Sequence, residues 1–398
     1  MKVVVTGVGI ISAIGNNVAA CLDAFEKHQS GVDGIHFLPT KHAGKLSVAE
    51  VKLTNTQLAE SLGLPNTLSR SILLSYKATQ EAIKDLPHHF SSSYRIGFFS
   101  GTTVGGMDKT ENFFNEYVDD VNTGNLEDVQ HHDCGKTADV VAKQLGLKGM
   151  VTTISTACSS SANTIMLGAR MIKNNQLDIV IAGGVDSLTR FTLNGFNTLQ
   201  ILDSEQCRPL DETRAGLNIG EGAAYIILMN ENVAKELQQE ILCSISGYHN
   251  ANDSFHQTAL SDDGNGPFLA MQGALKKSSL FASDISYINL HGTGTRNNDN
   301  AEGLAIQKVF NGKYPKLSST KSFTGHTLGA SGAVEAVLSV MAISKGIIFP
   351  NFAFKEPMLG LDIFPETSFQ KDIDVQHVMS NSFGFGGNCS SLIFSKYE

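Results

Sequence analysis

The hydrophobic pattern of the chain alternates between two periods from one end to the other. Short apolar runs of strand length are followed by segments whose apolar positions recur every three or four residues, as in an amphipathic helix. The predicted strands include residues 2–8, 95–102, 178–186, 222–230, 241–250 and 284–290, and a hairpin is predicted at 377–396. The predicted helices include residues 18–25, 70–83, 268–280 and 332–344. Strands separated by helical segments indicate an α/β fold with parallel sheets covered by helices.

Two segments of the chain share one pattern. Residues 153–172 and 317–343 both contain a strand, a turn of small residues and a helix. This internal similarity predicts two related halves that divide near residue 245, namely 1–245 and 246–398.

Composition and charge narrow the class of protein. The chain has 398 residues and a formal net charge of −9, without a long basic run, which argues against a nucleic-acid partner. Its cysteines are scattered and form no CxxC pair, so we expect reduced thiols in a cytoplasmic protein. These cysteines are Cys21, Cys134, Cys158, Cys207, Cys243 and Cys389.

The N-terminal stretch MKVVVTGVGIISAIGNNVAAC loosely resembles a lipoprotein signal. Its apolar part is interrupted by Gly7, Gly9 and Gly15, so a buried strand followed by a glycine turn explains it better. No apolar run approaches 18 residues, and we expect no membrane span.

Two further motifs imitate ligand sites. The GVGIIS stretch at residues 7–12 lacks the third glycine of a dinucleotide loop, so we interpret it as a tight turn. The HHDC stretch at residues 131–134 has no spaced partners, and four adjacent side chains cannot all converge on one ion. We therefore expect a solvated loop there and no metal site.

Cys158 lies between a β-branched strand and a helix, in the stretch VTTISTACSSSANTI at residues 151–165. The N-terminus of that helix would stabilise a thiolate and lower the pKa of the thiol. On this local evidence alone, a buried structural cysteine and a nucleophile remain equally good interpretations.

Other candidate groups follow predicted strands elsewhere in the chain. His291 begins HGTGT after one strand, and Lys321 and His326 lie in TKSFTGHTLGASG after another. Such strand ends are where α/β folds gather ligands. The turn NSFGFGGN at residues 381–388 offers backbone N–H groups to a developing oxyanion.

Taken together and in this order, the motifs resemble a known family. They are similar to the motifs of the elongating β-ketoacyl-acyl-carrier-protein synthases, the Cys-His-His condensing enzymes of the thiolase superfamily. The motifs that carry this resemblance are TACSSSANTI, HGTGTRNND, STKSFTGHTLGASGAVEA and NSFGFGGN. CRPLDETRAGLNIGEGAA and the opening VVVTGVGIISAIG match as well, so the resemblance spans nearly the whole chain. It implies a thiolase-like fold of two related βαβαβ halves in α-β-α-β-α layers.

The resemblance also implies a role for each matching residue. Cys158 would accept the acyl group, and neutral His291 and His326 would hold the malonyl thioester and stabilise its enolate. Lys321 would orient this group. The remaining implied roles are Glu335 and Asp299 in support, the N–H groups of Cys158 and Phe385 in an oxyanion hole, and Thr293, Thr295 and Phe385 at the pantetheine arm.

The implied reaction is decarboxylative condensation with malonyl-acyl-carrier protein in fatty acid elongation. Substrates would be carried on phosphopantetheine, with no other cofactor, and the protein would form a homodimer. Candidate contacts to the acidic carrier protein are Arg70, Lys77 and Arg208.

Departures from the family pattern keep alternatives open. Residues 125–141 replace a more basic segment, and Asn388 and Cys389 stand where Thr-Asn is more usual. Three alternatives remain: a thiolase that uses Cys389 as its base, a ketosynthase of a polyene or polyketide pathway, and a non-catalytic chain-length partner subunit. The presence of Cys158 and both histidines argues against the partner subunit.

Overall fold

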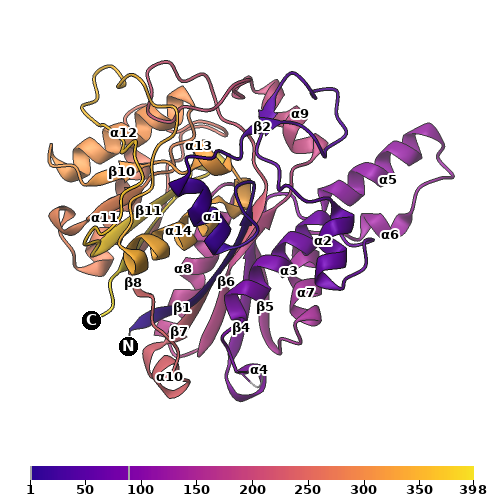
Figure 1. Ribbon diagram of the computed structural model, residues 1–398, viewed down its shortest axis with the longest axis horizontal. Coiled ribbons are helices and arrows are strands. Elements are labelled where there is room, and N and C mark those ends of the chain that lie inside the picture. The colour runs from indigo at the N-terminus through magenta and orange to yellow at the C-terminus, as the bar shows by residue number, and fades with distance from the viewer. Residues whose placement is uncertain (1, 88–89) are drawn as a thin grey trace.

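The computed structural model describes residues 2–87 and 90–398 and contains a large mixed sheet with helices on its faces (Figure 1). Its strands are β1 (Val3–Ser12), β4 (Ile96–Gly101), β5 (Gly149–Ile154), β6 (Ile179–Asp186), β7 (Gly222–Asn230), β8 (Cys243–Asn252), β9 (Tyr287–Asn289), β10 (Lys316–Ser318), β11 (His377–Phe383) and β12 (Asn388–Ser395). They pair in the order β10-β9-β11-β12-β8-β1-β7-β6-β4-β5. A separate small sheet pairs β2 (Asp33–Gly34) with β3 (Ser47–Val48).

The predicted helices at residues 70–83 and 332–344 are confirmed, the first with the same bounds. The α-helices are α1 (Val18–Glu26), α2 (Asn55–Leu62), α3 (Arg70–Ile83), α4 (Phe90–Ser93), α5 (Met107–Asp119), α6 (Leu126–Val129), α7 (Cys134–Gln144), α8 (Ser160–Lys173), α9 (Arg190–Thr198), α10 (Glu231–Glu236), α11 (Asn265–Ser278), α12 (Arg296–Phe310), α13 (Lys321–Thr324) and α14 (Ser331–Lys345). Short 3-10 helices are η1 (Ala282–Asp284), η2 (Leu328–Ala330) and η3 (Phe385–Gly387).

The sheet is mixed, which corrects the expectation of parallel sheets. β4 runs parallel to β5 and β6, and β9 runs parallel to β10 and β11. The strands β1, β7, β8 and β12 pair antiparallel to their neighbours. Alternation of strands and helices along the chain does not fix strand direction, because a long connection can bring the next strand back either parallel or antiparallel to the one before it.

The two ends of the sheet repeat one topology. The order β5-β4-β6-β7-β1 and the order β10-β9-β11-β12-β8 have the same sequence of strand directions. The predicted division into halves at residue 245 stays a prediction, and we propose moving it ahead of β8, which begins at Cys243.

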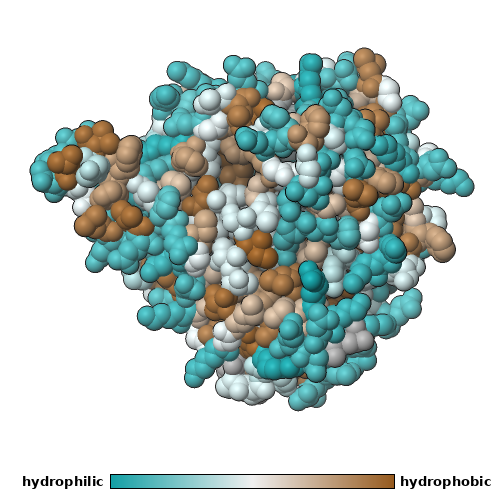
Figure 2. All heavy atoms as spheres, turned by 180° about the vertical axis from the view of Figure 1, so that it is seen from behind, coloured by the Kyte–Doolittle hydropathy of each residue, from teal (hydrophilic) through white to brown (hydrophobic). Residues whose placement is uncertain are grey.

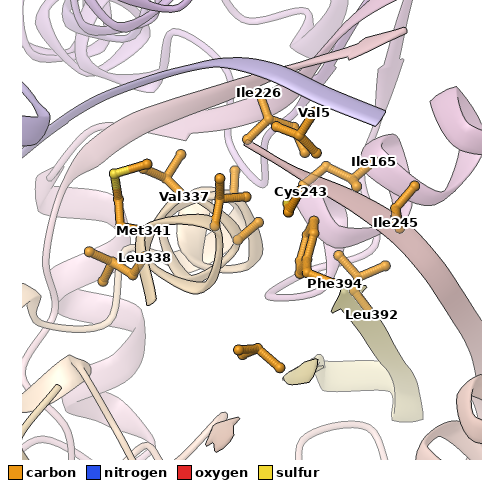
Figure 3. Close-up of a cluster of buried hydrophobic side chains, with 14 of the residues drawn as sticks. Val5, Ile165, Ile226, Cys243, Ile245, Val337, Leu338, Met341, Leu392 and Phe394 are labelled. Atoms are coloured by element: carbon orange, nitrogen blue, oxygen red, sulfur yellow. The ribbon is translucent and has the colours of Figure 1, made fainter. Parts of the chain in front are cut away.

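The two five-strand units meet at a narrow joint and enclose a central helical layer. β1 and β8 pair only through Val4 with Ser244 and Val5 with Cys243. Helices α8 and α14 pack between the units, while α3 and α7 cover one outer face and α11 the other. Figure 3 shows the resulting core, in which α14 meets strands of both units. Its labelled members are Val5, Ile165, Ile226, Cys243, Ile245, Val337, Leu338, Met341, Leu392 and Phe394.

The apolar stretch Leu328–Lys345, which contains η2 and α14, is long and apolar enough by composition to cross a membrane. This corrects the expectation that no run reaches that length. Within the described residues, 89% of the stretch is buried inside the protein. An apolar helix enclosed on all sides is typical of the core of a large layered protein.

Candidate active site

Cys158 lies in a tight turn between β5 and α8. Ala157 adopts a left-handed conformation with φ of 51°, which turns the chain sharply before the cysteine. The Ser160 hydroxyl accepts a hydrogen bond from the N–H of Thr156 at 2.9 Å and fixes the turn. Gly384 packs so closely that a Cβ there would lie 2.7 Å from the carbonyl oxygen of Thr156. The glycine-rich turn at residues 384–387 therefore lies directly against the cysteine.

His326 reaches the cysteine from the other half of the chain. Its Nε2 lies 3.1 Å from the Sγ of Cys158, and its Nδ1 lies 2.8 Å from the Oγ of Ser331. All three side chains are buried. The structure thus places a hydrogen-bonding ring against a thiol that is 168 positions away in sequence.

His291, Lys321 and Glu335 form a second buried group beside this pair. Lys321 is ion-paired with Glu335, and its Nζ lies 3.4 Å from the Nδ1 of His291. Because an ammonium group only donates hydrogen bonds, this Nδ1 accepts and the neutral ring carries its proton on Nε2. The rings of His291 and His326 are 5.4 Å apart and nearly perpendicular.

The electrostatics of the site favour neutral groups. Burial, with the charge of Lys321 acting in the same direction, lowers the pKa of both His291 and His326 well below its usual value. Burial raises the pKa of Cys158 to about 12, and Lys321 and the N–H of Phe385 offset only part of this shift. The expected low-pKa thiolate is therefore wrong for the resting site, because burial outweighs the stabilising groups around the sulfur.

Two cavities meet at Cys158 and are divided by Phe385. One, of about 390 Å³, is lined by both histidines, Thr293 and Thr295. The other, of about 550 Å³, extends past Phe385 and Phe196 between mostly apolar side chains. The rings of Phe385 and Phe196 stack at 5.7 Å. Cys158, Phe196, Thr258 and Phe385 line both cavities.

The turn after β9 is fixed by a buried carboxylate. Asp299 accepts hydrogen bonds from the backbone N–H groups of Leu210 and Gly294 at 2.9 and 3.2 Å. The hydroxyls of Thr293 and Thr295 lie 2.9 Å apart at the wall of the first cavity. Asp299 thus holds the loop that presents these hydroxyls.

Glu302 was not identified in the sequence analysis. It lies one helical turn after Asp299 on α12 and holds the same loop after β9. Its buried carboxylate accepts hydrogen bonds from the backbone N–H groups of His291 and Gly292 at 3.0 and 2.8 Å. It also accepts one from Asn381 at 3.1 Å, and burial raises its pKa to about 7. Its spacing of three residues from Asp299 was the only signal in the sequence.

Comparison with known families identifies the class of enzyme. Residues 1–234 match the beta-ketoacyl synthase N-terminal domain, and residues 242–355 match the beta-ketoacyl synthase C-terminal domain. The chain belongs to the beta-ketoacyl synthase family. It is accordingly a ketosynthase, an acyltransferase that forms carbon–carbon bonds, with the thiolase fold that the motifs predicted.

Relatives of known structure and name support this family over the full length. The 3-oxoacyl-[acyl-carrier-protein] synthase 2 of Staphylococcus aureus is 30% identical and covers 100% of this chain and 99% of its own. The structure titled the ishigamide ketosynthase/chain length factor is 27% identical with a TM-score of 0.94, over 100% and 99% of the two chains. A ketosynthase in complex with its chain length factor from Xenorhabdus doucetiae is 29% identical with a TM-score of 0.85, over 100% and 98%.

Membership of this family leaves Cys389, the second cysteine of the thiolase alternative, without that role. Cys389 is fully buried in β12 and packs against Leu260 and Phe383. It lines neither cavity at Cys158.

The three predicted contacts to a carrier protein lie in different settings. Arg70 is buried and forms a two-pronged ion pair with Glu221, at 2.7 and 2.6 Å, so its prediction as a surface contact is wrong. Lys77 is half-buried on α3. Arg208 is also half-buried, and it pairs with Asp203 at 3.3 Å. A chain sequence shows a cationic residue but not the buried carboxylate that neutralises it.

The HHDC stretch is partly helical. Asp133 caps α7, and its carboxylate accepts a hydrogen bond from the N–H of Gly135 at 3.0 Å. Across residues 2–87 and 90–398, no group of three or more His, Cys, Asp or Glu side chains is placed to hold a metal ion.

Proposed function

We propose that this ketosynthase carries its acyl chain on Cys158 and extends it with a malonyl-type thioester delivered by an acyl carrier protein. The observation that carries this proposal is the contact of 3.1 Å between Cys158 Sγ and His326 Nε2 at the junction of two cavities. A thiol whose pKa is raised to about 12 needs a neighbouring base before it attacks a thioester.

The first half-reaction transfers the acyl group. The thiol proton of Cys158 moves to His326 Nε2 while Sγ attacks the thioester carbonyl carbon. The N–H groups of Cys158 and Phe385 receive the negative charge on the carbonyl oxygen. The N–H of Phe385 already hydrogen-bonds the thiol, which supports this placement. When the bond from carbon to the carrier sulfur breaks, that sulfur takes the proton back from His326.

The second half-reaction forms the carbon–carbon bond. His291, with its proton on Nε2, donates to the malonyl thioester oxygen, and His326 donates from the other side. Loss of carbon dioxide leaves an enolate whose carbon attacks the acyl group on Cys158. The bond from the acyl carbonyl carbon to Sγ then breaks, and the thiolate regains a proton from solvent. Lys321 and Glu335 act by fixing the position and tautomer of His291.

We assign the two cavities to different parts of the substrate. The apolar cavity beyond Phe385 takes the acyl chain, because its walls offer mostly carbon surface. The other cavity takes the pantetheine arm, whose amides would meet the hydroxyls of Thr293 and Thr295.

Fatty acid elongation is the pathway we propose first. The relatives named 3-oxoacyl-[acyl-carrier-protein] synthase 2 support it, since they match over their full length. A polyene or polyketide ketosynthase is the second candidate, favoured by the likeness to ketosynthases solved with a chain length factor. Carrier-bound primers of graded length, with mass spectrometry of the products, separate the two. When saturated and conjugated unsaturated primers compete, preferential extension of the saturated chains to 3-oxoacyl products supports elongation, and preferential extension of the unsaturated chains supports the second.

We further propose that the protein acts as a dimer in the cytoplasm. Helices α5 and α6 form an arm that projects from the body (Figure 1), and apolar atoms are visible on it from behind (Figure 2). Its exposed apolar residues include Phe114, Tyr117, Val118, Val121, Leu126 and Val129. β5 lies at the edge of the sheet next to α7. Light scattering should show a homodimer. If the variant Phe114→Ser/Leu126→Ser is a monomer in the same measurement, the arm is supported as the dimer contact.

The direct test of the site replaces the nucleophile. Cys158→Ala should abolish the acyl adduct seen by intact mass spectrometry, while the fold and carrier binding persist. Cys207→Ala is the matched control, since Cys207 is an equally buried thiol outside both cavities. An adduct that forms on another cysteine of the unsubstituted protein would overturn the assignment.

A further inference from the structure

We propose that Ser331 is a positioning residue that lets His326 serve as acceptor in one half-reaction and as donor in the other. This inference rests on the proposed function, because it concerns the two tasks that the mechanism gives to one imidazole. It adds a residue that touches neither substrate nor Cys158.

The geometry around Ser331 supports such a role. Ser331 is the first residue of α14, it is 1% exposed, and its Oγ lies 2.8 Å from His326 Nδ1. The Oγ of Thr327, also buried, lies 3.3 Å from the Ser331 Oγ on the other side. α14 packs closely against α8 at this point, since a Cβ on Gly332 would lie 2.8 Å from Ala162.

The two half-reactions need different tautomers of the neutral ring. To accept the Cys158 proton, Nε2 must present its lone pair, so the ring proton lies on Nδ1 and is donated to Ser331. To donate to the malonyl thioester, Nε2 must carry the proton, so Nδ1 accepts from Ser331. A hydroxyl is the group that can do both, since it contains one donor and two acceptor positions.

The hydroxyl of Thr327 completes this arrangement in either state. When Nδ1–H donates to Ser331, the Ser331 hydroxyl can donate onward to Thr327. When Ser331 donates to Nδ1, its oxygen can accept from Thr327 instead. No buried polar group of the three is left without a partner in either tautomer. The change of tautomer takes one proton off Nδ1 by way of the Ser331 hydroxyl and puts one onto Nε2 from the cavity that His326 lines, so the ring stays neutral.

His291 lacks this freedom. Its Nδ1 faces Lys321, whose ammonium group only donates, so its proton stays on Nε2. The structure thus contrasts a fixed imidazole with an adaptable one, and the adaptable one lies within hydrogen-bonding distance of the thiol.

The test measures the half-reactions separately in Ser331→Ala. Without the hydroxyl, a proton on Nδ1 would be a buried donor without a partner, so the ring favours the tautomer with Nε2–H. Acylation of Cys158 from an acyl thioester, followed by intact mass spectrometry, should slow by about tenfold or more. Condensation of pre-acylated enzyme with a malonyl thioester in a single turnover should change less than about threefold. Ser331→Thr, which keeps a hydroxyl, should restore acylation.

Ser339→Ala is the matched control, because Ser339 is a buried serine of the same helix whose hydroxyl donates to the backbone oxygen of Glu335. It should leave both rates unchanged. Equal slowing of both half-reactions in Ser331→Ala, or no change in either, would overturn the role of Ser331. If Ser331→Thr does not fold, the comparison of the two alanine variants decides. Failure of the unsubstituted protein to acylate Cys158 would instead overturn the proposed function itself.

Discussion

Replacing Lys321 by methionine separates two consequences of one buried ion pair. Lys321 and Glu335 are each 1% exposed and in direct contact, and Lys321 also fixes the tautomer of His291. Lys321→Met leaves a carboxylate in the core without its counter-ion. Removing one partner of a buried pair costs about 3–5 kcal/mol of the free energy of unfolding when the other stays charged.

The loss of stability in Lys321→Met should depend on pH. Burial already raises the pKa of Glu335 to about 7, and loss of the lysine raises it further. The folded variant then holds a proton that the unfolded chain releases above the ordinary value of 4.5. The variant therefore becomes less stable as pH rises from about 5 to 8, by at most about 1.4 kcal/mol for each pH unit. Lys321→Met/Glu335→Gln, which removes the charge, should lose the part of this slope that Glu335 contributes. Buried Glu302, whose pKa is also raised to about 7, acts in the same direction in every variant.

Urea unfolding at pH 5, 6.5 and 8 measures the stability of all three proteins, and single-turnover assays measure the two half-reactions. Condensation should fall about a hundredfold in both variants, since one preoriented donor at a developing oxyanion is worth about 10²–10³ in rate. Acyl transfer to Cys158 should change much less. A double variant that regains condensation together with stability would refute the role of Lys321 at His291. A pH profile of Lys321→Met no steeper than that of the double variant would refute the account of Glu335.

Three further predictions concern burial and cavity shape. Arg70→Ala should lower the free energy of unfolding, measured in urea, by about 3–5 kcal/mol, because it leaves Glu221 unpaired. Lys77→Ala on the same helix should lower it by at most about 0.5 kcal/mol. An equal loss of stability in the two variants would contradict the buried ion pair. Gly195→Val should shorten the longest acyl chain accepted, because Gly195 lines the apolar cavity and a Cβ there meets no atom within 4 Å; an unchanged product length would place the chain elsewhere. The folded protein should lose stability as pH rises from 9 toward 12, because the unfolded chain then releases thiol protons that the folded chain keeps. An unfolding midpoint that does not move between pH 8 and pH 10.5 would contradict this. The thiols whose pKa burial raises from 9.0 to about 12 are Cys21, Cys158 and Cys207.

Much of the fold follows from local patterns. The helix at 70–83 was predicted with the bounds it has, because its apolar spacing is a local signal, and the structure adds Ser69 as its N-cap. The direction of β7 was not predictable, since β7 returns antiparallel to β6 through the long connection 187–221, whose course depends on packing. The membrane-length apolar stretch of η2 and α14 likewise becomes a core segment only because the two five-strand units of the sheet enclose it.

The chemical groups of the site were also available in the sequence, but their states were not. Strand-end motifs supplied Cys158, His291, Lys321 and His326, and their order matched one family. Protonation depends on surroundings that come from distant parts of the chain. Burial overcomes the N-terminus of α8 and keeps Cys158 protonated, whereas the helix alone had predicted a thiolate.

The sequence by itself determined which functional groups this protein carries and which elements hold them, because turn chemistry and periodicity act over a few residues. Only the tertiary structure decided what each group faces. It turned Arg70 from a surface cation into a buried partner of Glu221, and it brought Glu302 to His291 and Ser331 to His326. The physical reason is that desolvation and hydrogen-bond partners belong to the packed interior, where residues far apart in the chain set each other's charge and proton position.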